Sequence, residues 1–162
     1  MSTLRLHARA DGQLELAGID FTVAYCLGRV QPVLAARADA GVRDRLHPDA
    51  VPGDAARNAE WHRLMDGELR HLFEAAQATF ARDLEAFDPR TRRVAFPADH
   101  LKAWMSAINQ ARVVLAEQHQ IDATDLQSED FSPGSPRDSA RLQVHVLGYV
   151  LQVLVEHALE GA

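Results

Sequence analysis

Near the N-terminus apolar and polar residues alternate, which predicts two short β-strands joined by a turn. A three-residue loop over 10–12 pairs Leu6 with Leu16, so that the leucines of both strands share one face. Such a loop needs a left-handed residue at its third position, and Gly12 supplies it. We therefore expect an amphipathic hairpin over 3–17, and this hairpin must pack on another element because an isolated hairpin is only marginally stable.

Further along the chain, apolar residues recur every three or four positions, which is the period of an α-helix. Asp20 and Asp54 are suited to N-cap the first two helices, and Ser135 followed by Pro136 is a typical start for the last. Pro32 lies inside the first helix and predicts a kink, since its ring presses on the carbonyl four residues earlier. The pattern predicts main helices over about 20–37, 54–87, 97–119 and 136–160.

Two of these helices differ in their apolar surface. The 54–87 helix carries one stripe, made of Trp61, Met65, Leu69, Leu72, Phe73, Ala76, Phe80, Leu84 and Phe87. The 136–160 helix is apolar on most sides, so it is either the central helix or a helix shared with a partner subunit. Its polar interruptions argue against a membrane span, which needs about 20 mostly apolar residues.

The elements together predict a mostly α fold, a four-helix bundle-like domain with a small N-terminal β-hairpin. A chain of 162 residues suits a single helical domain over 1–162. Residues 38–53 hold two prolines and two glycines and are expected to form a loop with one short turn at most.

Composition narrows the functional classes. The chain is 47% hydrophobic and 25% charged, as expected for a globular protein, and its net charge of -6 makes nucleic-acid binding unlikely. The start of the sequence lacks an apolar signal core, so we expect a cytoplasmic protein. Cys26 is the single cysteine, and its position among apolar helix residues predicts a small buried hydrophobe rather than a nucleophile.

Motifs for cofactor or nucleophile chemistry are missing from the sequence, and no cofactor is expected. The sharpest metal candidate is Glu68 with His71, since carboxylate-bridged bundles use this three-residue spacing twice. Here the spacing occurs once, so an ordinary pair on a solvated face is the favoured interpretation. The same holds for His62 and Asp66, four residues apart.

Polar residues also interrupt the two most apolar faces near the C-terminus. Asn109 and Arg112 share one side of the third helix, and His145, Tyr149 and Gln152 follow one another at helical spacing in the fourth. If they face inward they need partners, because an unpaired buried polar group costs about 1–3 kcal/mol. A structural role, with Arg112 paired to a carboxylate, is favoured over a ligand or partner pocket.

Three stretches give the chain a family resemblance: WMSAINQARVVL at 104–115 with the turn after it, VLGYVLQ at 146–152, and LHPDAV at 46–51. They resemble an uncharacterised domain-of-unknown-function family of small helical proteins found mainly in high-GC actinobacteria. Genes of that family often lie near the gene for ClpS, the adaptor of the Clp protease, and some members are labelled transcriptional regulators. The resemblance implies no activity, cofactor or catalytic residue.

The sequence thus favours a non-enzymatic cytoplasmic protein of interaction or regulation, acting through protein–protein contacts. The 136–160 helix is expected to mediate a homodimer, because it is too apolar for a simple bundle surface. Two alternatives remain: a metal-binding bundle enzyme that uses Glu68 and His71, and a transcriptional regulator.

Overall fold

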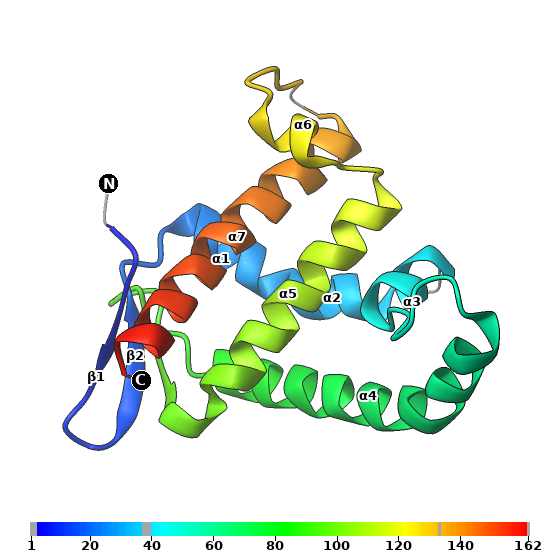
Figure 1. The fold of residues 1–162 in the computed structure, drawn as a ribbon. Helices are drawn as coiled ribbons and strands as arrows, with labels where there is room; N and C mark the ends of the chain where they lie inside the picture. The colour runs from blue at the N-terminus through cyan, green and yellow to red at the C-terminus, as the bar shows by residue number, and fades with distance from the viewer. Residues whose placement is uncertain (1–2, 37–39, 133, 162) are drawn as a thin grey trace.

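The structure is a computed structural model that describes residues 3–36, 40–132 and 134–161. It confirms the predicted fold class, a mostly helical fold with a small antiparallel sheet at one end (Figure 1). The elements in chain order are β1 (Arg5–Ala8), β2 (Gln13–Ala17), α1 (Phe21–Gly28), α2 (Val30–Ala35), α3 (Ala40–Leu46), α4 (Ala55–Leu84), β3 (Arg93–Pro97), the 3₁₀ turn η1 (Ala98–His100), α5 (Leu101–Gln118), α6 (Ala123–Gln127) and α7 (Pro136–Glu160).

The hairpin forms in the predicted register. Leu6 lies opposite Leu16, and Gly12 has a φ of 80° in the loop between the strands. The sequence did not predict that β3 joins this hairpin, giving a three-stranded sheet in the order β1-β2-β3. Leu14 pairs with Phe96 and Leu16 with Val94, and these four side chains are buried on the face that packs on the helices.

The first predicted helix, 20–37, is two helices. Asp20 caps α1 by accepting a hydrogen bond from the Val23 backbone N–H, at 2.9 Å. Pro32 has no N–H to donate to the Gly28 carbonyl, and α1 ends at Gly28 while α2 begins at Val30. The predicted kink is thus a break, and the end of the predicted range at 37 lies outside the described residues.

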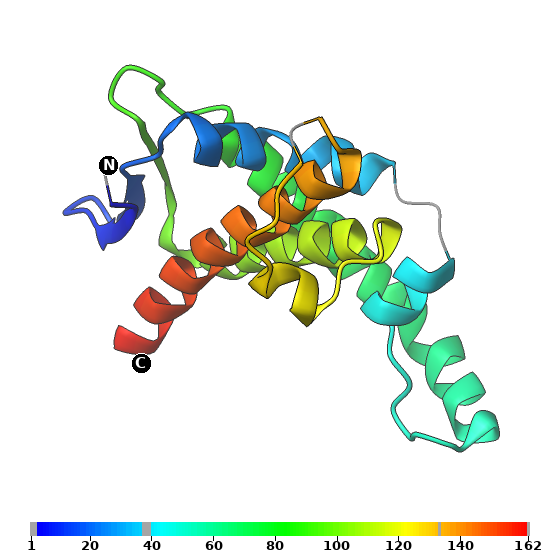
Figure 2. The ribbon, with the colours of Figure 1, turned by 90° about the horizontal axis from the view of Figure 1, so that it is seen from above.

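The second predicted helix, 54–87, is α4, and it ends three residues early at Leu84. Its C-terminal half packs on α5 and β3, whereas its N-terminal half extends away from the body together with α3 (Figure 2). The predicted stripe is not continuous core along the helix, because Leu72 is exposed and Trp61, Met65 and Leu69 are only partly buried. Residues 40–46, expected to be loop, form the helix α3, which packs on α5.

The third and fourth predicted helices, 97–119 and 136–160, correspond to α5 and α7. Pro97 ends β3 instead of opening a helix, and α5 begins at Leu101 after one 3₁₀ turn. The last helix has the predicted bounds, with Ser135 capping the Asp138 N–H. The short helix α6 opens with a capping box between Asp122 and Asp125, and Arg137 ties it to α7 through Asp125, at 2.7 Å.

Trp104 of α5 is the point where α4, α5 and the sheet meet. Its ring is fully buried, stacks on Phe96 of β3 at 4.2 Å between centroids, and meets the edge of Phe80 of α4 at 4.7 Å. Its indole N–H donates to Asp83 of α4 at 3.0 Å, and His100 lies 2.9 Å from the same carboxylate oxygen. The Asp83 carboxylate and the aromatic rings around it therefore hold β3, α4 and α5 together.

We predict that Asp83→Ala lowers the free energy of unfolding by about 1–3 kcal/mol, since it leaves the buried Trp104 indole N–H without an acceptor. Urea unfolding followed by circular dichroism measures the change. Asp99→Ala, which removes an exposed carboxylate from the same region, is the control and should change stability by less than about 0.5 kcal/mol. A loss for Asp83→Ala no larger than that of the control would contradict this role.

Candidate functional site

The five polar residues predicted on the two apolar helices do not converge on one pocket. Arg112 lies between α5 and α7, where its Nε donates to the backbone carbonyl of Val144 at 3.4 Å. Burial lowers the pKa of its guanidinium. The side chain passes over Gly148 of α7, where an added Cβ would lie 3.4 Å from Nε. Arg112 thus fixes α7 against α5 through a backbone carbonyl, not through the expected carboxylate.

The other four residues face solvent. Asn109 is exposed on α5, and His145, Tyr149 and Gln152 are exposed on α7. Gln152 donates from Nε2 to Glu156 of the same helix at 2.8 Å. The structure therefore brings His145, Tyr149 and Gln152 together on one outer surface of α7, and places Asn109 on a different helix.

An apolar strip runs beside these polar residues on α7. We define the outer strip as Leu142, Val146, Tyr149 and Val153, which share one face because they are spaced by four, three and four residues. Leu142 is 43% exposed and Tyr149 is 42% exposed, and the other two are partly buried. The opposite face of α7 is buried in the core, through Ala140, Gln143, Val144, Leu147, Val150 and Leu154.

A small hollow of about 300 Å³ lies where α1 and α2 meet α5 and α7, near the start of α7. Gln143 lines it, and its buried Oε1 atom has no hydrogen-bond partner among the described residues, while its Nε2 donates to the Ser139 carbonyl. The unpaired oxygen marks the least satisfied point at the α5–α7 interface.

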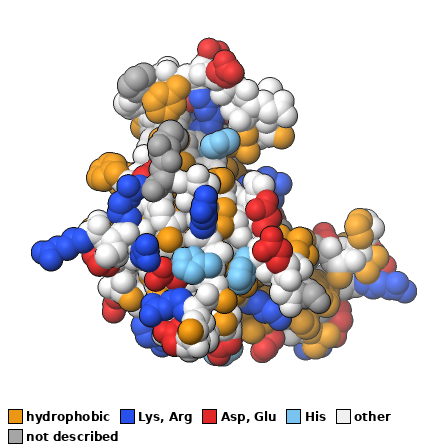
Figure 3. Space-filling model, turned by 90° about the vertical axis from the view of Figure 1, so that its left-hand side faces the viewer, with side chains coloured by type: hydrophobic (Ala, Val, Ile, Leu, Met, Phe, Trp, Pro, Cys, Tyr) orange, Lys and Arg blue, Asp and Glu red, His pale blue; other side chains and the backbone are white. Residues whose placement is uncertain are grey.

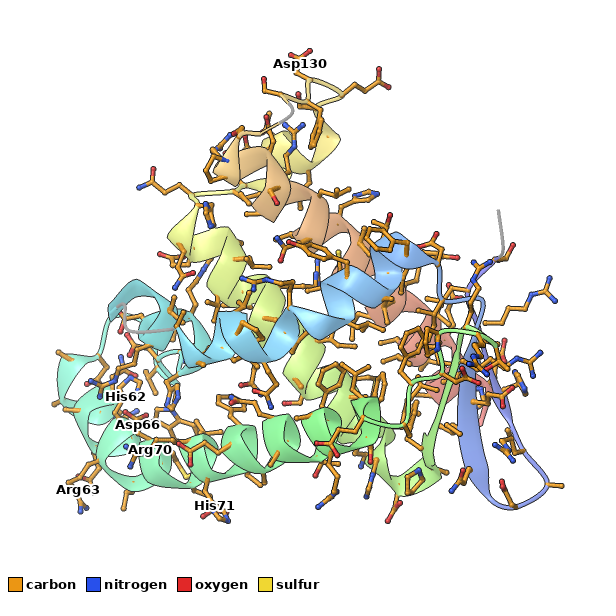
Figure 4. All side chains as sticks on the ribbon, turned by 180° about the vertical axis from the view of Figure 1, so that it is seen from behind. His62, Arg63, Asp66, Arg70, His71 and Asp130 are labelled. Atoms are coloured by element: carbon orange, nitrogen blue, oxygen red, sulfur yellow. The ribbon has the colours of Figure 1, made fainter. Side chains whose placement is uncertain are left out.

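The predicted metal pair is not built into a site. Glu68 and His71 are both exposed on the outer half of α4, and His71 points away from the rest of the molecule (Figure 4). Within the described residues, no group of three or more His, Cys, Asp and Glu side chains is arranged to hold a metal ion.

Sequence reasoning missed a polar network that fixes the outer half of α4. His62 and Asp66 point toward the preceding segment (Figure 4), with His62 Nδ1 2.9 Å from Asp66 Oδ1. His62 Nε2 lies 2.8 Å from Asp49, and Asp66 also accepts from His47 at 3.2 Å and Arg43 at 3.3 Å. The LHPDAV motif contains His47 and Asp49, so its residues secure α3 and the following loop to α4.

The charges of this network stabilise one another. Hydrogen bonds from His62, His47 and Arg43 lower the pKa of Asp66 to about 2. Hydrogen bonds to Asp66 and Asp49 raise the pKa of His62. The network is therefore strongest when His62 is protonated and Asp66 is ionised.

Cys26 behaves as the sequence predicts. It is buried in α1, and burial, with a smaller effect of the nearby Asp20 charge, raises the pKa of its thiol to about 11. At neutral pH the thiol stays protonated, which does not suit a nucleophile or a metal ligand.

One described helix, Pro136–Glu160, is long and apolar enough to cross a bilayer by length and composition, a property that core helices of soluble proteins share. The described residues form a small, mostly helical fold with one three-stranded sheet.

The chain belongs to the family described as Domain of unknown function (DUF2017), whose model matches residues 4–158. No curated protein and no solved structure matches it.

We predict that the α3 region becomes less protected from hydrogen exchange as pH rises from about 6 to 9. The raised pKa of His62 means that its stabilisation is complete below its unfolded value of 6.5 and is lost as pH rises through the folded value. Asp66 acts in the opposite direction, because folding lowers its pKa. Its stabilisation is complete above its unfolded pKa of 3.8 and is lost only as pH falls toward its folded pKa of about 2. Hydrogen-exchange mass spectrometry over 41–51, corrected for intrinsic rates, measures the effect.

His62→Gln should reduce this pH dependence, whereas the control His71→Gln, an exposed histidine on the same helix, should leave it unchanged. An undiminished pH dependence in His62→Gln would show that the network does not hold α3.

Proposed function

We propose that the chain is a non-enzymatic protein of interaction or regulation that acts in the cytoplasm through protein–protein contacts. Its interaction surface is the outer strip of α7, and its partner there is a second copy of the chain. The observation that carries this proposal is the exposure of Leu142 and Tyr149 on a helix whose opposite face is already buried in the core.

The uncovered position of α7 supports the proposal. In Figure 1 the helix lies in front of α1 and beside α5, and it packs on both. Its own chain therefore covers most of α7: Val146 and Val153 of the outer strip already pack against the core, and Leu142 and Tyr149 are left exposed to a partner. Aromatic residues such as Tyr149 are typical anchors of protein interfaces.

The spacing of the strip favours a second copy over an unrelated partner. The intervals of four, three and four residues read the same in both directions. A two-fold axis beside residues 147 and 148 would therefore place Leu142 opposite Val153, and Val146 opposite Tyr149, in an antiparallel pair of α7 helices. Each apolar side chain would then meet an apolar side chain.

The flank of the strip fits the same arrangement. His145 and Gln152 lie on one side of the strip, and in an antiparallel pair the same flanks of the two helices meet. His145 of one copy then lies beside Gln152 of the other, so that two polar groups form a partly solvated rim around an apolar centre. This is the usual arrangement of protein interfaces.

Neither alternative function has comparable support. Glu68 and His71 are both exposed, which does not suit a metal site inside a bundle. The net charge of -6 disfavours the large phosphate footprint that a transcriptional regulator needs.

We predict a dimer at micromolar concentration in sedimentation-velocity ultracentrifugation, and a dissociation constant at least roughly a hundredfold weaker for Tyr149→Glu, which would place a charge in an apolar interface. Leu72→Glu is the matched control, since Leu72 is an exposed leucine on α4, 54% accessible, outside the strip. It should leave the dimer unchanged, with both variants folded by circular dichroism. A strictly monomeric wild type, or equal weakening by both variants, would refute the proposed interface.

A further inference from the structure

The outer face of the sheet carries a basic hollow that the proposed function does not use. Its volume is about 700 Å³, within the range of small-molecule sites. Figure 3 shows this end of the molecule, with arginine and histidine side chains spread over it. The lining residues, which include no carboxylate, are Thr3, Arg5, His7, Ala17, Gly18, Thr91, Arg92 and Arg93.

The sheet register explains how the hollow forms. Arg5 of β1 and Arg93 of β3 both pair with Ala17 of β2, so the three residues form one row across the sheet. Alternation along the strands puts this row on the face opposite the buried Leu14 and Leu16. The backbones of Arg5 and Arg93 are therefore about 10 Å apart, which is twice the spacing between neighbouring strands. Between them lies Ala17, whose side chain is a single methyl group. The small residue leaves open space between two guanidinium groups.

The walls of this hollow are held firmly. Gly18 has a φ of 81°, and an added Cβ would lie 2.4 Å from the Thr3 carbonyl, so the N-terminal segment packs directly on a backbone that requires glycine. Arg92 has a φ of 59°, an uncommon conformation for a residue with a side chain. Backbone strain of this kind is found preferentially at functional sites.

Arg92 is also bound to the segment after β2 at two points. The Ile19 N–H donates to the Arg92 carbonyl, and Arg92 Nε donates to the Ile19 carbonyl, both at 3.1 Å. The turn before β3 and the end of β2 are therefore fixed relative to each other. The site is in this sense preorganised, which reduces the entropic cost of binding.

Charge at this end differs from that of the whole chain. Five arginines gather on the sheet and its two turns, with three carboxylates nearby. Glu15 accepts from Arg93 at 3.0 Å and lies 3.2 Å from His7. Asp11 pairs with Arg9 at the β1–β2 loop, and Asp88 accepts from the Arg90 N–H in the turn before β3. Arg5 is exposed on the edge strand. Positive charge thus remains in surplus here, on a chain whose net charge is -6.

We propose that this hollow binds a small phosphorylated molecule of about nucleotide size. Planar guanidinium groups bind phosphate oxygens through paired charge-assisted hydrogen bonds, and the Thr3 hydroxyl can add a further donor. A multiply charged phosphate group matches several arginines better than a single carboxylate does. A long nucleic acid is disfavoured because it would extend beyond this basic end onto a chain whose net charge is -6.

The test is isothermal titration of the full chain at low salt with three probes: inorganic pyrophosphate, ADP and a short DNA duplex. The proposal predicts saturable binding of pyrophosphate or ADP that weakens as salt is raised. Binding of both pyrophosphate and ADP would show that the phosphates are recognised, and binding of ADP without pyrophosphate would show that the nucleoside contributes. Binding of the duplex alone, or of none of the probes, would overturn the proposal.

Variants locate the site. Arg5→Gln with Arg93→Gln should weaken binding at least about tenfold, the usual effect of losing charged hydrogen bonds. Arg70→Gln, an exposed arginine of α4, is the control and should have no effect.

Ala17→Glu is a second variant that separates binding from folding. It would place a carboxylate between Arg5 and Arg93, and should therefore abolish binding without lowering the melting temperature. Unchanged binding in Ala17→Glu would refute the site even if the arginine variants failed to fold.

Discussion

The contact between α5 and α7 is the interaction on which the other parts of the structure depend. α5 buries Ala107, Ile108, Ala111 and Leu115, α7 buries Val144, Leu147, Val150 and Leu154, and the two helices pack on each other. Arg112 adds a hydrogen bond from α5 to the α7 backbone. The remaining elements pack around this pair: α4 and α2 on α5, and α1 and β1 on α7. Because α7 buries one face in the core, Leu142 and Tyr149 on its outer strip remain exposed.

Periodicity predicted the parts of the fold that depend on local rules. Ser135 with Pro136 placed the start of α7, Asp54 placed the start of α4, and the loop ending at Gly12 fixed the register of the hairpin. What could not be predicted depends on contacts distant in the sequence. Arg93–Pro97 carries too short a pattern to be identified as a third strand, and its role follows from Phe96 stacking on Trp104. The outer half of α4 has an apolar period like the inner half, yet no element covers Leu64 or Leu72 in the described structure.

In the candidate sites, too, the sequence predicted local features, whereas contacts between distant residues could not be predicted. The sequence placed His145, Tyr149 and Gln152 on one helix face, and the structure shows that this face is the solvated one. It also noted His62 with Asp66 and, separately, the LHPDAV motif, but only tertiary structure brings Asp49 within 2.8 Å of His62. The basic hollow depends on strand register, since Arg5 and Arg93 are distant in sequence and are neighbours of one alanine in the sheet. The net charge of the whole chain is negative, so composition alone does not reveal such a local surplus of arginine.

The central claim is that α7 has one face for the core and one for an antiparallel second copy. Inter-chain distance measurement by double electron–electron resonance tests it most directly, using single spin labels at His145, on the rim, or at Leu159 in a Cys26→Ser background. An axis beside residues 147 and 148 predicts labels much farther apart at Leu159 than at His145, by roughly 27 Å along the helix at 1.5 Å per residue. Equal distances at the two positions, as in a parallel pair, or no inter-chain signal at all, would contradict the account.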